Sequence, residues 1–305
     1  MDGQPFHPGE LKAQALAGQS SRGTGIRSFM PDQHREFFAL LPYIFVAGLD
    51  TASRPIATVL TGEEGFVASP SPTELAIAAR PAAHDPAMAA FAAGAPIGLL
   101  GLDFRSRRRN RANGRITALT DGGMTAAIGE SFGNCAKYIQ ARQHEAVPAS
   151  APTTEELAGL DPAARSLIAQ SDTLFIASAS KSGVDISHRG GRPGFIAVEG
   201  DRLTVPDFAG NSYFNTLGNL LLEPAASLLF IDFSSGDLIQ LQGETEIVWD
   251  RPERDELAGA QRFWRFHSQR GWRRREALSL RWSAPEPAPT TLATGRWRPT
   301  SAAAG

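Results

Sequence analysis

Short apolar runs separated by glycine, proline, aspartate and asparagine recur along much of the chain. Runs of this length with such punctuation predict short β-strands in a barrel or sandwich, and they argue against a parallel α/β sheet. Alternation is clearest in residues 238–248, where Ile239 and Leu241 share one face and glutamines take the other. Helices are predicted where Asp32 and Asp161 precede apolar residues and can cap or charge a first turn. The pattern therefore predicts a mainly β fold with flanking helices, in the α+β class.

The predicted elements occur twice in the same order, and the two copies share residues at a constant offset. Residues 65–67 (Gly-Phe-Val) correspond to residues 194–196 (Gly-Phe-Ile), and residues 98–114 share 6 identities with residues 227–243. Ordinary composition would give about one identity over that length. We interpret the copies as a tandem duplication whose period is too long for a solenoid. The alternative is two unrelated β-rich segments with chance matches.

The duplication divides the chain into four parts. They are an N-terminal arm (1–28), a first barrel copy (29–145), a second copy with a C-terminal extension (154–283) and a tail (284–305). The tail is rich in proline and alanine, which is typical of disorder. A charged helix is predicted over residues 251–262 of the extension.

Composition and charge restrict the classes of function. The 305 residues carry a formal net charge of −2, so any anion-binding surface must be local, and no nucleic-acid partner is expected. Cys135 is the single cysteine, which excludes an internal disulfide. No apolar run reaches the roughly 18 residues of a membrane helix, and the first residues have no signal-peptide core. A cytoplasmic protein without a membrane partner is therefore expected.

Residues 187–192 (Ser-His-Arg-Gly-Gly-Arg) form the first candidate binding segment. Arginine presents a fork of donors suited to phosphate, and glycine lets a ligand approach the backbone closely. The alternative is a solvated basic hairpin turn. The second candidate runs from Asp207 through Asn211 to Asn215 and Thr216, at the start of a predicted helix whose free N–H groups could bind an anion. Ordinary N-capping is the alternative there.

The third candidate is the arginine-rich stretch from residue 105 to residue 115. Alternation places Arg107, Arg109 and Arg111 on one strand face, with Arg108 and Asn110 on the other. A strand that is polar on both faces needs a ligand or partner to be fully buried. A charged edge strand is one alternative, and a nucleic-acid patch, which would lack interleaved aromatic residues, is another.

Nucleophilic and metal chemistry have weak support in the sequence. His144 is the only histidine near Cys135, and no third catalytic member is evident, so Cys135 is predicted to be a small packed residue. The 6 histidines have no paired spacing, so no metal site is predicted. Neither a glycine-rich dinucleotide fingerprint nor a P-loop is present.

Three segments together carry a family resemblance: ESFGNC-x-x-YIQ from residue 130, SHRGGRPGF from residue 187 and PDFAGN-x-x-FNTLGNLL from residue 206. With these segments the chain resembles the pyridoxamine 5'-phosphate oxidase-like proteins, the FMN-binding split barrels, and especially a flavin-nucleotide-binding branch of them. The resemblance implies tandem split barrels with FMN at the interface of two barrels. The two barrels would come from a homodimer or from an intramolecular pseudo-dimer.

The resemblance also implies an FMN-dependent oxidoreductase with an unidentified small-molecule substrate or electron donor. A non-catalytic flavin- or haem-binding module is the alternative. His188 stands where the family usually has an arginine, and Asn215 and Thr216 stand where a basic phosphate-binding pair often lies. The arginines of the first copy are therefore expected to supply the missing charge. No catalytic residue is assigned, and the expected cofactor-binding residues are Ser187, His188, Arg189, Gly190, Asp207, Asn211, Asn215, Thr216, Arg107, Arg108, Arg109 and Asn110.

Overall fold

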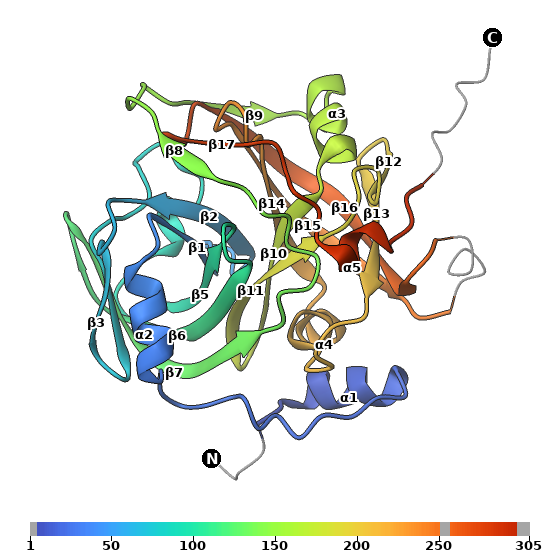
Figure 1. Cartoon of the computed structure of the whole chain (residues 1–305), viewed down its shortest axis with the longest axis horizontal. Helices are drawn as coiled ribbons and strands as arrows, with labels where there is room; N and C mark the ends of the chain where they lie inside the picture. Colours follow the sequence, from blue (N-terminus) through green and yellow to red (C-terminus); the bar gives the residue numbers. More distant parts are fainter. Residues whose placement is uncertain (1–4, 251–256, 298–305) are drawn as a thin grey trace.

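Two antiparallel sheets with the same strand order form the body of the molecule (Figure 1). The computed structural model describes residues 5–250 and 257–297. The first sheet has the order β2-β1-β5-β6-β7-β4-β3, and the second has the order β11-β10-β14-β15-β16-β13-β12. Each strand of one sheet thus has a counterpart at the same place in the other. The predicted mainly β fold with flanking helices and two copies of one split barrel is confirmed.

The strands of the first sheet are β1 (Tyr43–Leu49), β2 (Pro55–Thr61), β3 (Val67–Ser71), β4 (Glu74–Ile77), β5 (Pro96–Asp103), β6 (Arg108–Thr120) and β7 (Gly123–Asn134). Those of the second are β10 (Thr173–Ser180), β11 (Gly183–Gly190), β12 (Ala197–Glu199), β13 (Arg202–Phe208), β14 (Ala225–Ile231), β15 (Leu238–Val248) and β16 (Ala260–Arg275). Strand β9 (Thr153–Leu157) adds to β16, and β8 (His144–Ala146) pairs with β17 (Leu280–Trp282).

Apolar side chains form three clusters, one inside each barrel and one between the two barrels. Because side chains alternate along a strand, Ile44 and Val46 of β1 fill the first barrel, while Phe45 faces the second barrel. Phe175 of β10 takes the same place in the second copy. The two rings stack with centroids 3.7 Å apart and planes 19° apart. The cluster between the barrels therefore joins equivalent strands of the two copies.

Edge strands lie at the contact between the barrels. β11 packs on β5 and β6 of the first barrel, and its counterpart β2 packs on β14 and β15 of the second. The exchange of partners means that the two copies are related by approximate twofold symmetry. Each copy covers the exposed edge of the other, which removes a site of unwanted strand pairing.

Helices differ more between the copies than strands do. α2 (Asp32–Ala39) and α3 (Pro162–Gln170) precede the first strand of each copy, and the Asp161 side chain accepts a hydrogen bond from the Ala164 N–H to cap α3. The second copy alone has α4 (Asn215–Leu222); the first has only the 3₁₀ turn η1 (Met88–Ala90). This difference lies beside the contact between the barrels.

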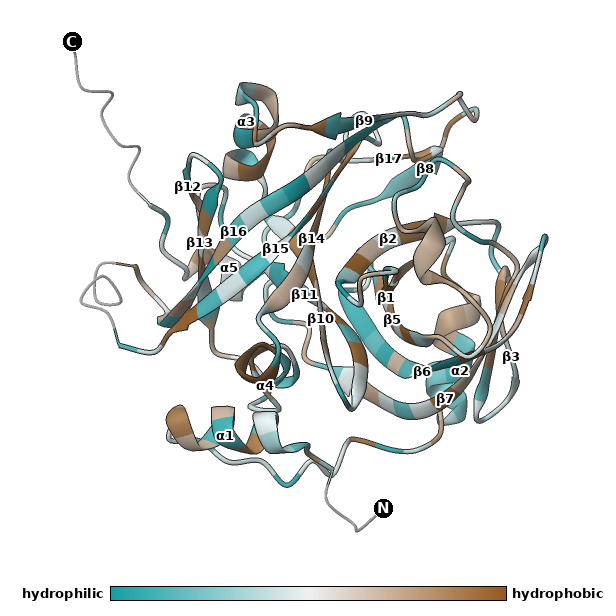
Figure 2. Cartoon of the chain, turned by 180° about the vertical axis from the view of Figure 1, so that it is seen from behind, coloured by the Kyte–Doolittle hydropathy of each residue, from teal (hydrophilic) through white to brown (hydrophobic). Residues whose placement is uncertain are grey.

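The N-terminal arm carries α1 (Pro8–Leu16), which packs on α4 (Figure 1). The helices touch at Gly9 and Gly218, where a Cβ atom on Gly9 would lie 2.1 Å from the Gly218 carbonyl oxygen. Figure 2 shows the mostly apolar α4 lying beside α1. Within the described ranges, none of the helices is long and apolar enough to cross a membrane.

Two predictions for the C-terminal region are wrong. The tail was expected to be disordered, yet it contains α5 (Pro289–Leu292), because the Gln140 amide donates to Thr291 Oγ1 and accepts from the Ala288 N–H. Residues 298–305 of the tail lie outside the described residues. The charged helix predicted over 251–262 is also wrong where it is described, since residues 260–262 begin β16 and pair with β13. Residues 251–256 are outside the described part.

The stack between the barrels yields a prediction about stability. Phe175→Ala removes a fully buried ring from the cluster between the barrels and should lower the free energy of unfolding by about 3–5 kcal/mol. Urea unfolding followed by tryptophan fluorescence measures this loss. Leu222→Ala, at a position that is 45% exposed, is the control and should change stability by less than about 1 kcal/mol. Equal losses in the two variants would contradict the role of the stack.

Candidate functional site

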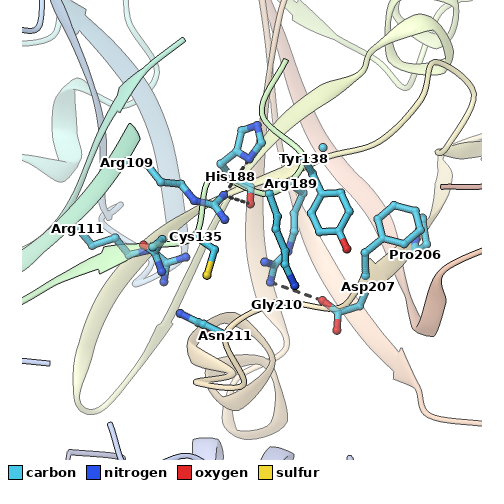
Figure 3. Close-up of a pocket in the computed structure, with 14 residues that line it drawn as sticks. Arg109, Arg111, Cys135, Tyr138, His188, Arg189, Pro206, Asp207, Gly210 and Asn211 are labelled. Atoms are coloured by element: carbon cyan, nitrogen blue, oxygen red, sulfur yellow. Dashed lines mark hydrogen bonds and ion pairs between the residues drawn. The ribbon is translucent and has the colours of Figure 1, made fainter. Parts of the chain in front are cut away.

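A cleft between the two barrels gathers side chains from both copies (Figure 3). β6 and the segment after β7 contribute from the first copy, and β11, β13 and the loop before α4 contribute from the second. A second lobe continues from the cleft past Arg189 and Asp207 to Arg262, Thr216 and Gln19 of the N-terminal arm.

Positively charged groups outnumber carboxylates on the cleft wall. Arg109 Nη1 lies 3.0 Å from His188 Nδ1, and among the described residues no carboxylate pairs with Arg109. Arg189 is 3.9 Å from Asp207, but that carboxylate already binds Arg262 at 2.5 Å. The Asp207 carboxylate is therefore shared between two guanidinium groups, and among the described residues Arg109 has no carboxylate partner.

Several buried nitrogen atoms of these side chains lack a hydrogen-bond partner in the described part of the chain. They are Nε of Arg109, Arg111 and Arg189, and Nε2 of His188. Buried polar groups in proteins are nearly always satisfied, so donors of this kind that line a cleft are available to a bound ligand. Guanidinium donors in particular suit an anion with several oxygen atoms.

The protonation states follow from burial and from the clustering of positive charge. Burial, with repulsion from Arg111 and Arg189, lowers the pKa of Arg109 to about 9. Burial, followed by repulsion from Arg109 and Arg189, lowers the pKa of His188 well below its usual value, so the imidazole is neutral at pH 7. The pKa of Arg189 is also lowered, mainly by burial. An anion bound here would oppose each of these shifts.

Arg111, next along the same face of β6, lies in an internal network beside the cleft. Its Nη1 donates to both Asp185 oxygens at 3.1 Å and to Asn215 Oδ1 at 3.1 Å, and its Nη2 donates to Ser187 Oγ at 2.6 Å. The Ser187 and Thr216 hydroxyls are 2.7 Å apart. These side chains join the first barrel to the start of α4.

Backbone geometry at the cleft fixes Tyr138. This residue has a left-handed backbone (φ 63°), as do Ser212 and Phe214 in the loop before α4. Gly190 permits the arrangement, since a Cβ atom there would lie 2.0 Å from the Tyr138 carbonyl oxygen. The Tyr138 hydroxyl donates to the Ala209 carbonyl, and its ring lies 5.3 Å from that of Phe208. Strained backbone of this kind concentrates at functional sites.

The structure brings most of the predicted site residues together. His188, Arg189, Gly190, Asp207, Asn211 and Arg109 line the main cleft, and Asn215 and Thr216 line its second lobe. Ser187 is fully buried behind them. Their binding of a cofactor stays a prediction.

The arginine-rich stretch is divided between two surfaces. The prediction that Arg107 shares a strand face with Arg109 and Arg111 is wrong, because Arg107 lies in the turn before β6. Arg109 and Arg111 line the main cleft, whereas Arg107, Arg108 and Asn110 line a second groove, to which Arg109 also contributes. Arg108 stacks over the Phe37 ring at 4.8 Å, and Arg107, whose backbone is left-handed, donates to the Ile139 and Glu286 carbonyls. Arg107, Arg108 and Asn110 do not line the main cleft, and their part in cofactor binding stays a prediction.

Sequence reasoning left Tyr138 and Arg262 off the list of site residues, although Tyr138 belongs to a segment that carried the family resemblance. The prediction that Cys135 is a packed core residue is wrong, because Cys135 is exposed on the cleft wall. Among the described residues no group of histidine, cysteine and acidic side chains could hold a metal ion.

Comparison with protein families finds a match to the second copy. Residues 160–282 match the family model described as pyridoxamine 5'-phosphate oxidase. Residues 160–282 are therefore similar to this family, and the match covers less than half of the chain. The matched range runs from the residue before the Asp161 cap through β17, so it spans the second barrel. No curated protein matches the chain.

Several solved structures are also similar to this chain, at low sequence identity. An FAD-binding protein from Mesorhizobium loti is 12% identical, with a TM-score of 0.31 over 41% of this chain and 98% of that one. The haem storage protein HutZ from Vibrio cholerae is 13% identical, with a TM-score of 0.28 over 37% and 92%. An FMN-binding protein from Syntrophomonas wolfei is 12% identical, with a TM-score of 0.28 over 36% and 82%.

Glu10 of the arm yields a prediction about pH. Its carboxylate accepts from Asn215 Nδ2 at 2.5 Å, and burial raises its pKa to about 7. The unfolded pKa is about 4.3, so the folded state binds more protons between these values, and the stability due to Glu10 is lost as pH rises towards 7. Glu10→Gln should therefore gain stability relative to the parent chain between pH 5 and pH 8, by up to about 3 kcal/mol.

Urea midpoints at the two pH values measure that difference. Glu36→Gln, which alters an exposed carboxylate, is the control and should track the parent chain at both. A Glu10→Gln profile parallel to that of the parent chain would contradict the buried, proton-binding carboxyl.

Proposed function

We propose that this chain binds FMN in the cleft between its two barrels, with the phosphate held by the guanidinium groups of Arg109 and Arg189. The observation that carries the proposal is the excess of positive charge with orphaned nitrogen atoms in the cleft of a chain whose second copy matches the pyridoxamine 5'-phosphate oxidase model. Arginine pairs readily with phosphate oxygens, and a dianionic group would balance the two cations that Asp207 cannot neutralise alone.

The residues of the cleft fit the other parts of FMN as well. Tyr138 and Phe208 present aromatic surface for a planar ring system. Asn211 and the neutral His188 supply polar contacts for a ring edge. Gly210 adds no side chain, and nothing lies within 4 Å of the place where its Cβ atom would be, which leaves space for the ligand at the loop before α4.

Bound FMN would supply electron or hydride transfer. The protein's part would be to bind and orient it: Arg109 and Arg189 fix the anion, and the Tyr138 ring, pinned at its hydroxyl, limits how the planar group can tilt. We therefore propose an FMN-dependent oxidoreductase that acts on a small-molecule substrate or electron donor. The cytoplasmic location stays a prediction.

A non-catalytic haem-binding module is the second candidate. It is favoured by one observation, the unpartnered Nε2 of a neutral histidine on the cleft wall, since neutral imidazole is a good metal ligand. The absorption spectrum of the purified or reconstituted protein distinguishes the two. Flavin bands support FMN, and a Soret band that is lost in His188→Ala supports haem. A colourless protein that cannot be reconstituted with FMN or haem would contradict both candidate functions.

The charge argument yields a prediction about affinity. Arg189→Gln and Arg109→Gln each remove a charge-assisted contact of roughly 1.5–3 kcal/mol and should raise the Kd for FMN about 10- to 100-fold. Quenching of flavin fluorescence on titration measures Kd. Arg115→Gln makes the same change of charge on the same strand, where the side chain donates to the Gly94 carbonyl instead, and is the control.

Arg108→Gln tests the division of the arginine cluster. Because Arg108 stacks on Phe37 in a separate groove, we expect a Kd within about twofold of the parent value for this variant. A larger loss in Arg108→Gln than in Arg109→Gln would contradict the assignment of the phosphate to the main cleft.

A further inference from the structure

Approximate twofold symmetry gives the cleft an equivalent position on the other side of the Phe45–Phe175 stack. The strand registers define that position. Phe45 pairs with Leu100, which pairs with Arg111, and Phe175 pairs with Leu229, which pairs with Gln240. Gln240 is therefore the counterpart of Arg111.

In the same registers, every basic residue that β6 and β11 bring to the cleft has an uncharged residue as its counterpart in the other copy. Arg109 corresponds to Leu238, and Arg111 to Gln240. On the edge strands, His188 corresponds to Val59 and Arg189 to Leu60. Ser187 corresponds to Thr58, so the polar character of that one position is kept. The charge excess that suits an anion is present in one half of the molecule only.

A compact ion pair fills the equivalent position. Arg274, the counterpart of Asn134, donates from Nη1 to Asp85 Oδ2 at 2.7 Å. Thr58 Oγ1 donates to the same carboxylate at 2.6 Å, and Gln240 Nε2 donates to Asp85 Oδ1 at 3.2 Å. Asp85 is 4% exposed, Arg274 5%, and Thr58 and Gln240 0%. One positive and one negative charge balance within a core that solvent does not reach.

Asp85 reaches this place because the first copy has no helix like α4. Its carboxylate also accepts from the Ala87 N–H, which holds the turn that leads into η1 against the barrel contact. In the second copy the corresponding space lies at the start of α4, beside the open lobe of the cleft. The connection that contains η1 closes one of the two symmetry-related positions, and the connection that contains α4 leaves the other open.

We infer that each chain holds one ligand, in the cleft at Arg109 and Arg189, and that its symmetry-related position is a closed structural ion pair. The inference rests on the proposed function for the identity of the ligand, but not for the difference between the two positions. Because the cleft takes residues from both copies of one chain, it is complete without a second subunit.

Titration of the full-length chain, after removal of any bound cofactor, with FMN tests the number of ligands bound per chain. We expect saturation at one FMN per chain, with a Kd that is independent of protein concentration. Saturation at two per chain, or a Kd that improves as the protein is concentrated into dimers, overturns the inference. Absence of binding contradicts the proposed function instead, and the next two measurements then decide the inference without flavin.

Labelling with phenylglyoxal compares the two positions directly. Arg189, whose side chain is 26% exposed, should react and be protected by inorganic phosphate, whereas Arg274, at 6%, should stay unlabelled in the folded chain. Labelling of Arg274 at the rate of Arg189, with protection by phosphate, overturns the inference.

A matched pair of variants separates structure from binding. Asp85→Asn leaves Arg274 buried without its partner and should lower Tm by on the order of 10 °C. Where FMN binds, the stoichiometry and Kd of Asp85→Asn at a temperature well below its Tm should equal those of the parent chain, while Arg189→Gln should change Kd and hardly change Tm. An unchanged Tm in Asp85→Asn, or an FMN stoichiometry that differs from that of the parent chain, overturns the inference.

Discussion

Packing of each barrel's edge strand against the other barrel is the constraint on which this structure depends. Edge strands expose unpaired backbone groups, and neither sheet closes on itself to remove them. β5 and β11 approach so closely that a Cβ atom on Gly98 would lie 2.8 Å from the Val184 carbonyl oxygen. That approach brings β6, which neighbours β5, over β11. The cleft exists because two sheets that could not close alone are closed by each other.

The same contact explains why arginines meet where no carboxylate balances them. Removing a charged group from water costs several kcal/mol unless it is paired, and the other arginines that are buried in residues 5–250 and 257–297 are paired with carboxylates. Arg142 binds Asp172 at 2.7 Å, and Arg274 binds Asp85 at the same distance. Arg109 departs from that rule, and burial lowers its pKa to about 9. A structural role would not require such a cost, whereas binding of an anion would recover it.

The sequence predicted the fold well because the fold is encoded locally and twice. Turn residues and apolar runs fixed the strands, and the constant offset between residues 98–114 and 227–243 revealed the duplication before any contact was known. Alternation also placed Arg109 and Arg111 on one face and Arg108 on the other. Patterns within one strand were sufficient for each of these conclusions.

The candidate site was harder to predict, because it depends on contacts between distant segments. Arg111 meets Asp185 and Asn215 across 74 and 104 residues, and Tyr138 is placed by a glycine in another strand. The Arg107–Asn110 cluster looked continuous in the sequence, but the sheet divides it between two surfaces. β16 was missed because its aromatic and arginine residues show no clean alternation and contribute to two neighbours at once, β13 and β15.

Fusion of the two copies into one chain has a physical consequence for the site. In a homodimer every residue occurs at both symmetry-related positions, so an ion pair that closed one position would close the other as well. In this chain Asp85 and Arg274 occur once, and so do Arg109 and Arg189. One position can therefore be filled by a charge-balanced core that supports the interface, while the other keeps an excess of positive charge. The difference between η1 and α4, the least conserved connection between the copies, is what makes that separation possible.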